Sequence, residues 1–194
     1  FVGIAALSGA DISVYGFQLE QGSYATSYIP TSGSAVTRVA DACSQTVPDG
    51  IIGQTEGTIF WEIDVKEKIG VLTDDLFNFD DGSFGNTIFL YKIASGIINC
   101  GIFVGGTQQA DFSLPEASWD IGIIKMALGY ANNNSAVFVN GVQVGITDTS
   151  CSIPAMSRIQ LGATQVGGSF SQTKQAKLYN TRLSNSELAA LTTI

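Results

Sequence analysis

Histidine is absent from the 194 residues of this chain, and basic side chains are scarce. Without histidine, the chain lacks the commonest general base and the commonest transition-metal ligand. Nine Lys and Arg against seventeen Asp and Glu give a formal net charge of −8. A chain this acidic lacks the basic patch that binding to nucleic acid or to an anionic membrane surface requires. We therefore expect neither kind of partner.

Long hydrophobic runs are also missing. No segment reaches the roughly 18 consecutive apolar residues of a membrane span, so we expect no membrane insertion. The apolar start at residues 1–7 has no basic flank and does not resemble a signal peptide, which indicates that the chain begins inside a longer protein. The three cysteines are too far apart in sequence for a disulfide framework or a zinc site. We expect buried free thiols at Cys43, Cys100 and Cys151, with one disulfide and a spare thiol as the alternative.

Glycine and apolar residues are abundant. The chain has 22 Gly against 4 Pro, and 45% of its residues are hydrophobic while 13% are charged. This composition is typical of many short strands joined by tight turns. Residues 58–65 alternate cleanly, with Ile59, Trp61, Ile63 and Val65 on one face. Further strands are predicted at 12–19, 86–93, 96–105, 121–130, 136–139, 142–144, 158–162 and 176–179.

Two local signals complete the predicted fold. Asn140-Gly141 lies between apolar runs and predicts a tight hairpin, because both of its residues tolerate positive φ. Ser184 and Glu187 form the pattern of a capping box and predict a short helix. The sequence therefore predicts an all-β, two-sheet antiparallel jelly-roll sandwich with one short C-terminal helix.

The C-terminal segment carries a family resemblance. Residues 176–188, Ala-Lys-Leu-Tyr-Asn-Thr-Arg-Leu-Ser-Asn-Ser-Glu-Leu, resemble the closing strand and helix of laminin G-like domains in the concanavalin A-like superfamily. The hairpin at 138–142 resembles a hairpin of the same domains. The resemblance implies that residues 57–194 form one laminin G-like sandwich.

A second resemblance lies near the start. Residues 16–31, Gly-Phe-Gln-Leu-Glu-Gln-Gly-Ser-Tyr-Ala-Thr-Ser-Tyr-Ile-Pro-Thr, and residues 36–41 resemble a junction in phage tail-fibre and other virion-appendage proteins. It implies that residues 1–22 are the last strands of a preceding module and that residues 23–56 are a connector packed on the sandwich. It also implies a place on the virion surface, other virion proteins as partners, and a homotrimer.

One segment could carry catalysis. Glu62, Asp64 and Glu67 fit the E-x-D-x-x-E pattern of laminarinase-type glycoside hydrolases, as nucleophile, supporting acid and acid/base. Glu62 and Asp64 share a strand face, but Glu67 has the opposite parity, and the strand is expected to be the first of the sandwich. We therefore predict a polar strand face and no enzyme, with a hydrolase as the remote alternative.

An acidic stretch could bind a cation. Asp74, Asp75, Asp80 and Asp81 could supply the oxygen ligands that Ca²⁺ prefers. The alternative is ordinary turn chemistry, because Asp-Asp-Gly is typical of turns. Calcium is the one cofactor that the sequence leaves open.

Aromatic and amide side chains give candidates for sugar binding. These candidates are Tyr91, Trp119, Tyr130, Asn132, Asn133 and Asn134. The function predicted with them is that of a non-catalytic virion-appendage domain, in a tail or head fibre, that binds host-surface glycan. The alternative is a structural fibre or decoration module held by oligomer contacts.

Overall fold

A computed structural model of the chain describes residues 9, 11, 13, 15–19, 28–36, 43–66, 74–93, 95–161 and 171–194. The chain forms two compact units, Phe1–Val39 and Ala40–Ile194. In the first unit, the backbone N–H of Ile29 donates to Gln18 Oε1 at 2.7 Å. Residues 15–19 are not in a strand, and the other part of the expected strand, Ile12 and Val14, lies outside the described residues.

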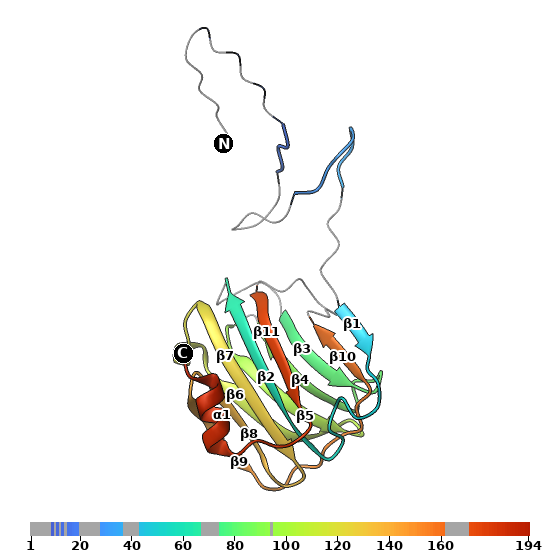
Figure 1. Cartoon of the computed structure of the whole chain (residues 1–194), viewed down its shortest axis with the longest axis vertical. Coiled ribbons are helices and arrows are strands. Elements are labelled where there is room, and N and C mark those ends of the chain that lie inside the picture. The colour runs from blue at the N-terminus through green and yellow to red at the C-terminus, as the bar shows by residue number, and fades with distance from the viewer. Residues whose placement is uncertain are drawn as a thin grey trace. The chain divides into compact units, whose positions relative to one another are not determined.

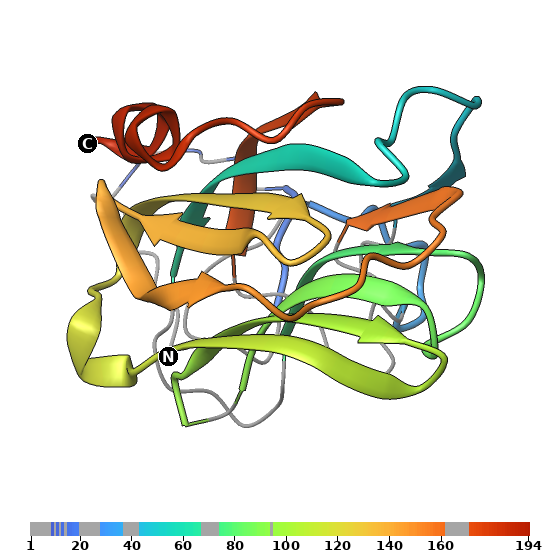
Figure 2. The ribbon, with the colours of Figure 1, turned by 90° about the horizontal axis from the view of Figure 1, so that it is seen from below.

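The second unit is a sandwich of two antiparallel sheets (Figures 1 and 2). The six-stranded sheet has the order β1 (Cys43–Thr46), β10 (Arg158–Leu161), β3 (Asp74–Asp80), β4 (Thr87–Lys92), β5 (Ile98–Val104) and β6 (Thr107–Leu114). The five-stranded sheet has the order β11 (Ser171–Tyr179), β2 (Glu56–Val65), β7 (Gly122–Ala131), β8 (Ser135–Val139) and β9 (Val142–Asp148). A 3₁₀ turn, Glu116–Ser118, precedes β7, and α1 (Asn185–Thr192) follows β11. The predicted two-sheet sandwich with one short C-terminal helix is confirmed.

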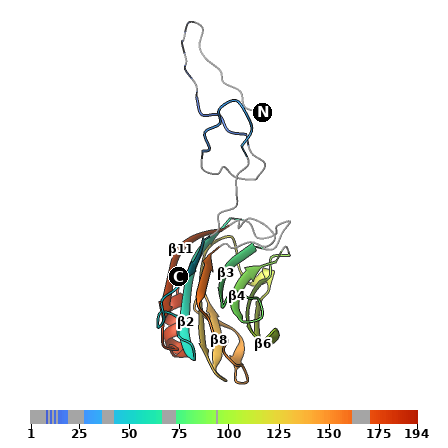
Figure 3. The same cartoon turned by 90° about the vertical axis from the view of Figure 1, so that its right-hand side faces the viewer.

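The core lies between the two sheets, which Figure 3 shows in side view with β2 and β11 in one layer and β3, β4 and β6 in the other. The predicted inner face of β2 is confirmed, because its four apolar residues are each at most 4% exposed. Trp61 meets Phe77 of the opposite sheet at 4.6 Å between ring centroids, and Phe77 meets Phe79 edge-on at 4.4 Å. Buried aromatic rings contribute much of the apolar area of a core.

Helix α1 covers part of the outer face of the five-stranded sheet. Leu188 is fully buried there against Phe60 of β2 and Phe138 of β8. The predicted capping box is present, because the Glu187 N–H donates to Ser184 Oγ at 3.3 Å and the Ser184 N–H donates to Glu187 Oε2 at 2.7 Å. Across the described ranges, no helix has the length and apolar character needed to cross a membrane.

The predicted β8–β9 hairpin is confirmed. Its two connecting residues, Asn140 and Gly141, have φ of 48° and 84°. Residues 132–134 form a tight turn between β7 and β8, in which Asn133 has φ of 56°. Positive φ at these positions explains why Asn and Gly occupy them.

Three strands were not predicted, and each has a reason. β1 lies in the stretch expected to be a connector, and its four residues are all exposed, so no apolar periodicity marks it. β3 lies in the acidic stretch, where a register shift between Asp75 and Phe77 breaks the alternation. β6 has only two buried residues. The expectation that β2 is the first strand is also wrong, because β2 lies inside its sheet between β11 and β7.

The cysteines differ in exposure. Cys100 and Cys151 are buried, as expected, whereas Cys43 at the start of the edge strand β1 is exposed. All three are free thiols, so the alternative with one disulfide is wrong. Burial, together with the nearby charge of Asp111, raises the pKa of the Cys100 thiol to about 12.

We expect a thiol reagent such as DTNB at pH 8 to label Cys43 alone in the folded protein, and all three cysteines in denaturant. Buried thiols react slowly because the thiolate is the nucleophile and burial disfavours it. The measurement is the absorbance of the released thiolate. A Cys43→Ser variant should release none while folded, and labelling of that variant at the wild-type rate would contradict the assignment.

The capping box gives a pH-dependent prediction. The hydrogen bonds from Ser184 lower the pKa of Glu187 below its ordinary 4.5. A carboxylate with a lowered pKa stabilises the fold above its unfolded-state pKa, and this contribution is lost as the pH falls. We expect Glu187→Gln to lower the urea midpoint at pH 7 and to lower it less at pH 3, because the folded-state carboxylate becomes protonated as the pH falls. A difference of the same size at both pH values would contradict the role of the charge.

Candidate functional site

Two of the residues predicted to bind sugar lie in the core. Trp119 is 4% exposed, and its Nε1–H donates to the Gly96 carbonyl at 2.9 Å. Tyr130 is 2% exposed, and its hydroxyl donates to the Gly53 carbonyl at 2.9 Å. The Tyr130 ring fills the space beside Gly57, its partner on β2, and burial raises its pKa. Neither ring can stack on a ligand without leaving the core, so the prediction is wrong for both.

The three candidate asparagines are exposed in the turn between β7 and β8, and two of them make hydrogen bonds to the segment after β9. Asn132 Oδ1 accepts from the Ile153 N–H at 3.1 Å. The Asn133 N–H donates to the Cys151 carbonyl at 2.8 Å. This loop joins β7 to β8 in the five-stranded sheet, whereas Tyr91 lies on β4 of the other sheet. The predicted sugar-binding residues therefore do not form one site.

The two acidic pairs of the acidic stretch lie at opposite ends of β3. Asp74 and Asp75 begin the strand, and Asp80 ends it with Asp81 directly after. A strand rises about 3.3 Å per residue, so the two pairs lie roughly 17 Å apart, too far to share one ion. The side chains of Asp74 and Asp75 lie outside the described residues. In the parts of the chain that the structure describes, no three His, Cys, Asp or Glu gather as metal ligands would.

Asp81 makes the turn that the alternative predicted. Its Oδ1 accepts from the backbone N–H of Ser83 at 2.9 Å and from the Ser83 hydroxyl at 2.7 Å. Its Oδ2 accepts from Asn86 Nδ2 at 2.8 Å. These hydrogen bonds lower the pKa of Asp81. Both oxygens therefore serve the β3–β4 connection.

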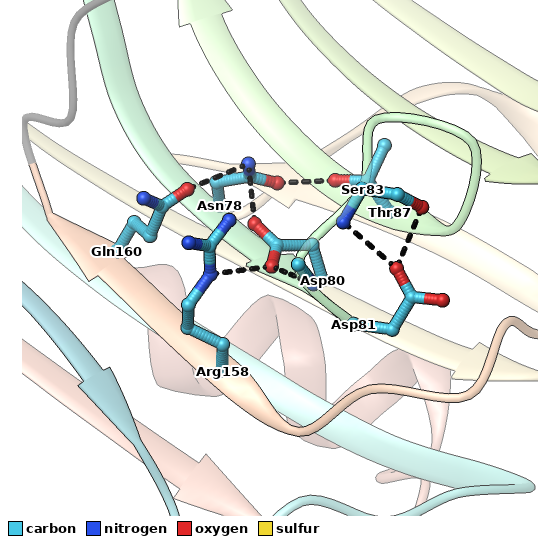
Figure 4. A network of polar contacts seen from close by, with 8 residues as sticks. Asn78, Asp80, Asp81, Ser83, Thr87, Arg158 and Gln160 are labelled. Carbon is cyan, nitrogen blue, oxygen red and sulfur yellow. Dashed lines mark hydrogen bonds and ion pairs between the residues drawn. The ribbon is translucent and has the colours of Figure 1, made fainter.

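Asp80 is a buried acid at the end of β3, and Figure 4 shows the contacts around it. It is 1% exposed, and its Oδ1 accepts from Arg158 Nε at 2.7 Å and from the Gly82 N–H at 2.8 Å. Its Oδ2 accepts from Asn78 Nδ2 at 3.0 Å. A buried carboxylate is tolerated when it is paired and hydrogen-bonded in this way.

Arg158 keeps hydrogen-bonding capacity beyond this pair. Its side chain is 32% exposed, and its two terminal nitrogens have no hydrogen-bond partner among the described residues. The hydrogen bond to Asp80 raises the pKa of Arg158, and the charges of Asp80 and Asp81 add to the effect. A fixed guanidinium with free N–H groups can donate to a ligand.

Asn78 extends the network across three strands. Its Nδ2 also donates to Gln160 Oε1 of β10 at 3.3 Å, and its Oδ1 accepts from the Thr87 hydroxyl of β4. Antiparallel pairing places Asn78 beside both Gln160 and Phe89. The network therefore ends directly beside an aromatic side chain.

Three aromatic residues lie on the outer face of the same sheet. Phe89, Tyr91 and Phe103 alternate with the core residues of β4 and β5 and are half-buried. Phe89 stacks on Tyr91 at 4.9 Å between centroids with planes 29° apart, and Phe103 lies 5.6 Å from Phe89. Gly101, opposite Phe89, leaves room for the Phe89 ring to lie over its backbone. Tyr91 also accepts from Asn99 Nδ2 at 3.4 Å.

We call this surface the aromatic–polar face. It consists of Asn78, Phe89, Tyr91, Asn99, Phe103, Arg158 and Gln160. It combines a stacked aromatic platform with donors and acceptors held by neighbouring side chains. Such a surface can hold a ring that has one apolar side and a hydroxyl-bearing edge. Of the predicted sugar-binding residues, Tyr91 alone belongs to it.

Two of the possible hydrolase residues, Glu62 and Asp64, lie elsewhere, on the outer face of the five-stranded sheet. Asp64 contacts Lys66 Nζ at 2.6 Å and Lys174 Nζ at 3.5 Å. The hydrogen bond from Lys66 lowers the pKa of Asp64, with Lys174 adding to it. Glu62 pairs with Lys125 of β7 and Gln175 of β11 across the strands, and Glu67 lies outside the described residues. Glu62 and Asp64 therefore form the polar strand face that the sequence predicted.

The sequence held a signal for the aromatics that was missed. Ile88 and Leu90 mark the inner face of β4, so strand parity places Phe89 and Tyr91 outside. The same parity places Tyr130 with Ile124, Met126 and Leu128, inside. No local signal links Arg158 to Asp80, because the two residues are 78 positions apart.

Comparison with known proteins identifies the class of fold. No protein-family model and no curated protein matches the chain. Solved structures do match, and they define a β-sandwich like the CBM40 domains of sialidases. The match agrees with the two-sheet antiparallel sandwich expected from the sequence.

Three solved structures illustrate the similarity. The CBM40 of Ruminococcus gnavus IT-sialidase bound to α2,3-sialyllactose is 18% identical, with a TM-score of 0.60 over 81% of this chain and 96% of that one. The leech intramolecular trans-sialidase is 18% identical, with a TM-score of 0.57 over 80% of this chain and 26% of that one. Trypanosoma rangeli sialidase is 19% identical, with a TM-score of 0.56 over 72% of this chain and 22% of that one. The match thus covers nearly all of the CBM40 structure and about a quarter of the two larger proteins.

The packing of Phe89 on Gly101 can be tested by stability. A Cβ at position 101 would overlap the far edge of the Phe89 ring, so Gly101→Ala forces the ring to move. We expect this variant to lose roughly 1–3 kcal/mol of unfolding free energy, the range for overpacking. In a Phe89→Ala background the same substitution should cost clearly less. Equal costs in both backgrounds, measured by urea unfolding, would contradict the contact.

Proposed function

We propose that this chain is a non-catalytic carbohydrate-binding module that holds a glycan on the aromatic–polar face. The observation that carries the proposal is the aromatic cluster beside a fixed polar network on one outer face. Sugars have apolar C–H faces and hydroxyl edges, so stacking and directional hydrogen bonds recognise them together. The opposite outer face is partly covered by α1 and carries charged side chains instead.

The rigidity of this face supports binding. Asn78 and Thr87 hold each other, and Asp80 holds Arg158, so few side chains need to be ordered when a ligand arrives. Preorganised groups bind more tightly because less conformational entropy is lost. The fold adds support, because CBM40 domains of this shape have been solved with α2,3- and α2,6-sialyllactose bound.

The absence of catalysis is part of the proposal. The sequence has no histidine, and Asp64 is paired with two lysines that favour its charged form. Catalysis of this type needs carboxylates tuned to donate and accept protons, whereas Asp64, the supporting acid of the pattern, is held in ion pairs on a strand face. A binding role needs no such tuning.

The virion setting rests on the sequence alone. Residues 16–31 and 36–41 carry the resemblance to virion-appendage proteins, and the homotrimer and the host-surface glycan follow from that resemblance. The setting, the domain limits at 22 and 56, and the alternative of a structural fibre or decoration module remain predictions. Binding to a bacterial surface glycan would favour adsorption over a structural role.

The proposal predicts the effect of removing the platform. We expect Phe89→Ala and Tyr91→Ala each to weaken glycan binding by roughly 2- to 10-fold, since one aromatic contact contributes about 0.5–1.5 kcal/mol. The measurement is a glycan array followed by titration calorimetry on the best ligand. Phe84→Ala is the matched control, because Phe84 is 60% exposed and lies outside the face.

Two results would contradict the proposal. Unchanged affinity in both platform variants would place the ligand elsewhere on the molecule. No binding by the folded chain across a broad panel of neutral and acidic glycans would reject the binding role and favour the structural one.

A further inference from the structure

The aromatic–polar face has one described cation, and that cation is already paired. Arg158 Nε lies 2.7 Å from Asp80 Oδ1, and Asp80 is 1% exposed. Lys92 of β4 has the same parity as Ile88 and Leu90 and is 1% exposed, so it does not reach the outer face. The positive charge on this surface is therefore compensated before a ligand arrives.

Carboxylates outnumber that cation on and around the face. Asp111 of β6 is exposed and lies opposite Gly101, within the same cross-strand row as Phe89. Asp81 follows Asp80 in the adjoining turn and is also exposed. Together with the net charge of −8 of the whole chain, these residues make the local potential negative.

An acidic sugar would meet this charge unfavourably. Its carboxylate would approach Arg158 only beside Asp80 and Asp81, and like charges at short range repel. A neutral sugar meets no such cost. Its hydroxyl or acetamido oxygens can accept from the terminal N–H groups of Arg158, which have no partner among the described residues. Its apolar side can rest on Phe89 and Tyr91.

We infer that the ligand of this module is a neutral glycan and not a sialylated or otherwise carboxylated one, an inference that rests on the proposed function. It separates this chain from the CBM40 structures solved with sialyllactose, with which it shares 18–20% of its residues and the fold. The inference rests on the Asp80–Arg158 pair and on the acids that flank it in this chain.

Pairs of array glycans that differ only by one terminal sialic acid test this inference. We expect the full chain to bind the neutral member, and the sialylated member at least about fivefold more weakly, which corresponds to about 1 kcal/mol. Raising NaCl from about 0.05 to about 0.5 M should strengthen binding to the sialylated member and leave the neutral member unchanged, because salt screens the repulsion.

A charge-deleting variant tests the residue responsible. Asp80→Asn keeps the shape and an acceptor for Arg158 but removes the compensating charge. We expect it to shift the sialylated-to-neutral affinity ratio at least about fivefold toward the sialylated member. Asp111→Asn removes the same charge from the same face without contacting Arg158, and it should shift the ratio less. If Asp80→Asn does not fold, the salt titration on the unaltered chain decides.

The outcomes separate the two proposals. Preference for the sialylated member, or binding to it that weakens with salt, overturns the inference and leaves the binding role standing. Equal shifts in Asp80→Asn and Asp111→Asn overturn the assignment to the Asp80–Arg158 pair. If the folded chain binds neither member of any pair and no other glycan on the array, both the proposed function and the inference are overturned.

Discussion

The apolar layer between the two sheets is the constraint on which the rest of the molecule depends. Trp61 of one sheet meets Phe77 of the other, and Phe77 packs edge-on against Phe79. The inner residues of β2, β4, β5 and β7 surround these rings. Successive strand residues point to opposite sides, so burying one set fixes the other set on the outside. A slip of one residue in any strand would turn its apolar residues toward solvent. The positions of Phe89 and Tyr91 follow from the burial of Ile88 and Leu90.

The second organising interaction is electrostatic. Asp80 is almost fully buried at the end of β3, and a carboxylate in that place is costly unless it is paired. Arg158 and Asn78 supply the partners, and through them β10, β3 and β4 hold their outer side chains in fixed positions. The same pair sets the charge of the face that it borders. In our proposal, this one contact links the stability of the fold to the ligand preference.

Burial explains which candidate residues were misjudged. Aromatic and amide residues are the usual sugar-binding groups, but a side chain can contact a sugar only if it is exposed at the surface. Tyr130 has the same parity as the inward-facing residues of β7, and its partner on β2 is a glycine, so its ring lies in the core. Trp119 follows a 3₁₀ turn, where no periodicity indicates its direction. Tyr91 is on the outer face because its neighbours in the strand are needed inside. The acidic pairs of β3 were read as one group because the strand between them was not recognised.

The sequence by itself determined the local elements. Alternation defined β2, the Asn140-Gly141 pair defined a hairpin, and Ser184 with Glu187 defined the start of the helix. Each of these depends on residues that are neighbours along the chain. Only the tertiary structure decided that Arg158 meets Asp80 and that Gly101 lies beneath Phe89. The physical reason is that cross-strand neighbours depend on strand order and register, which are set by the burial of residues far apart in the sequence.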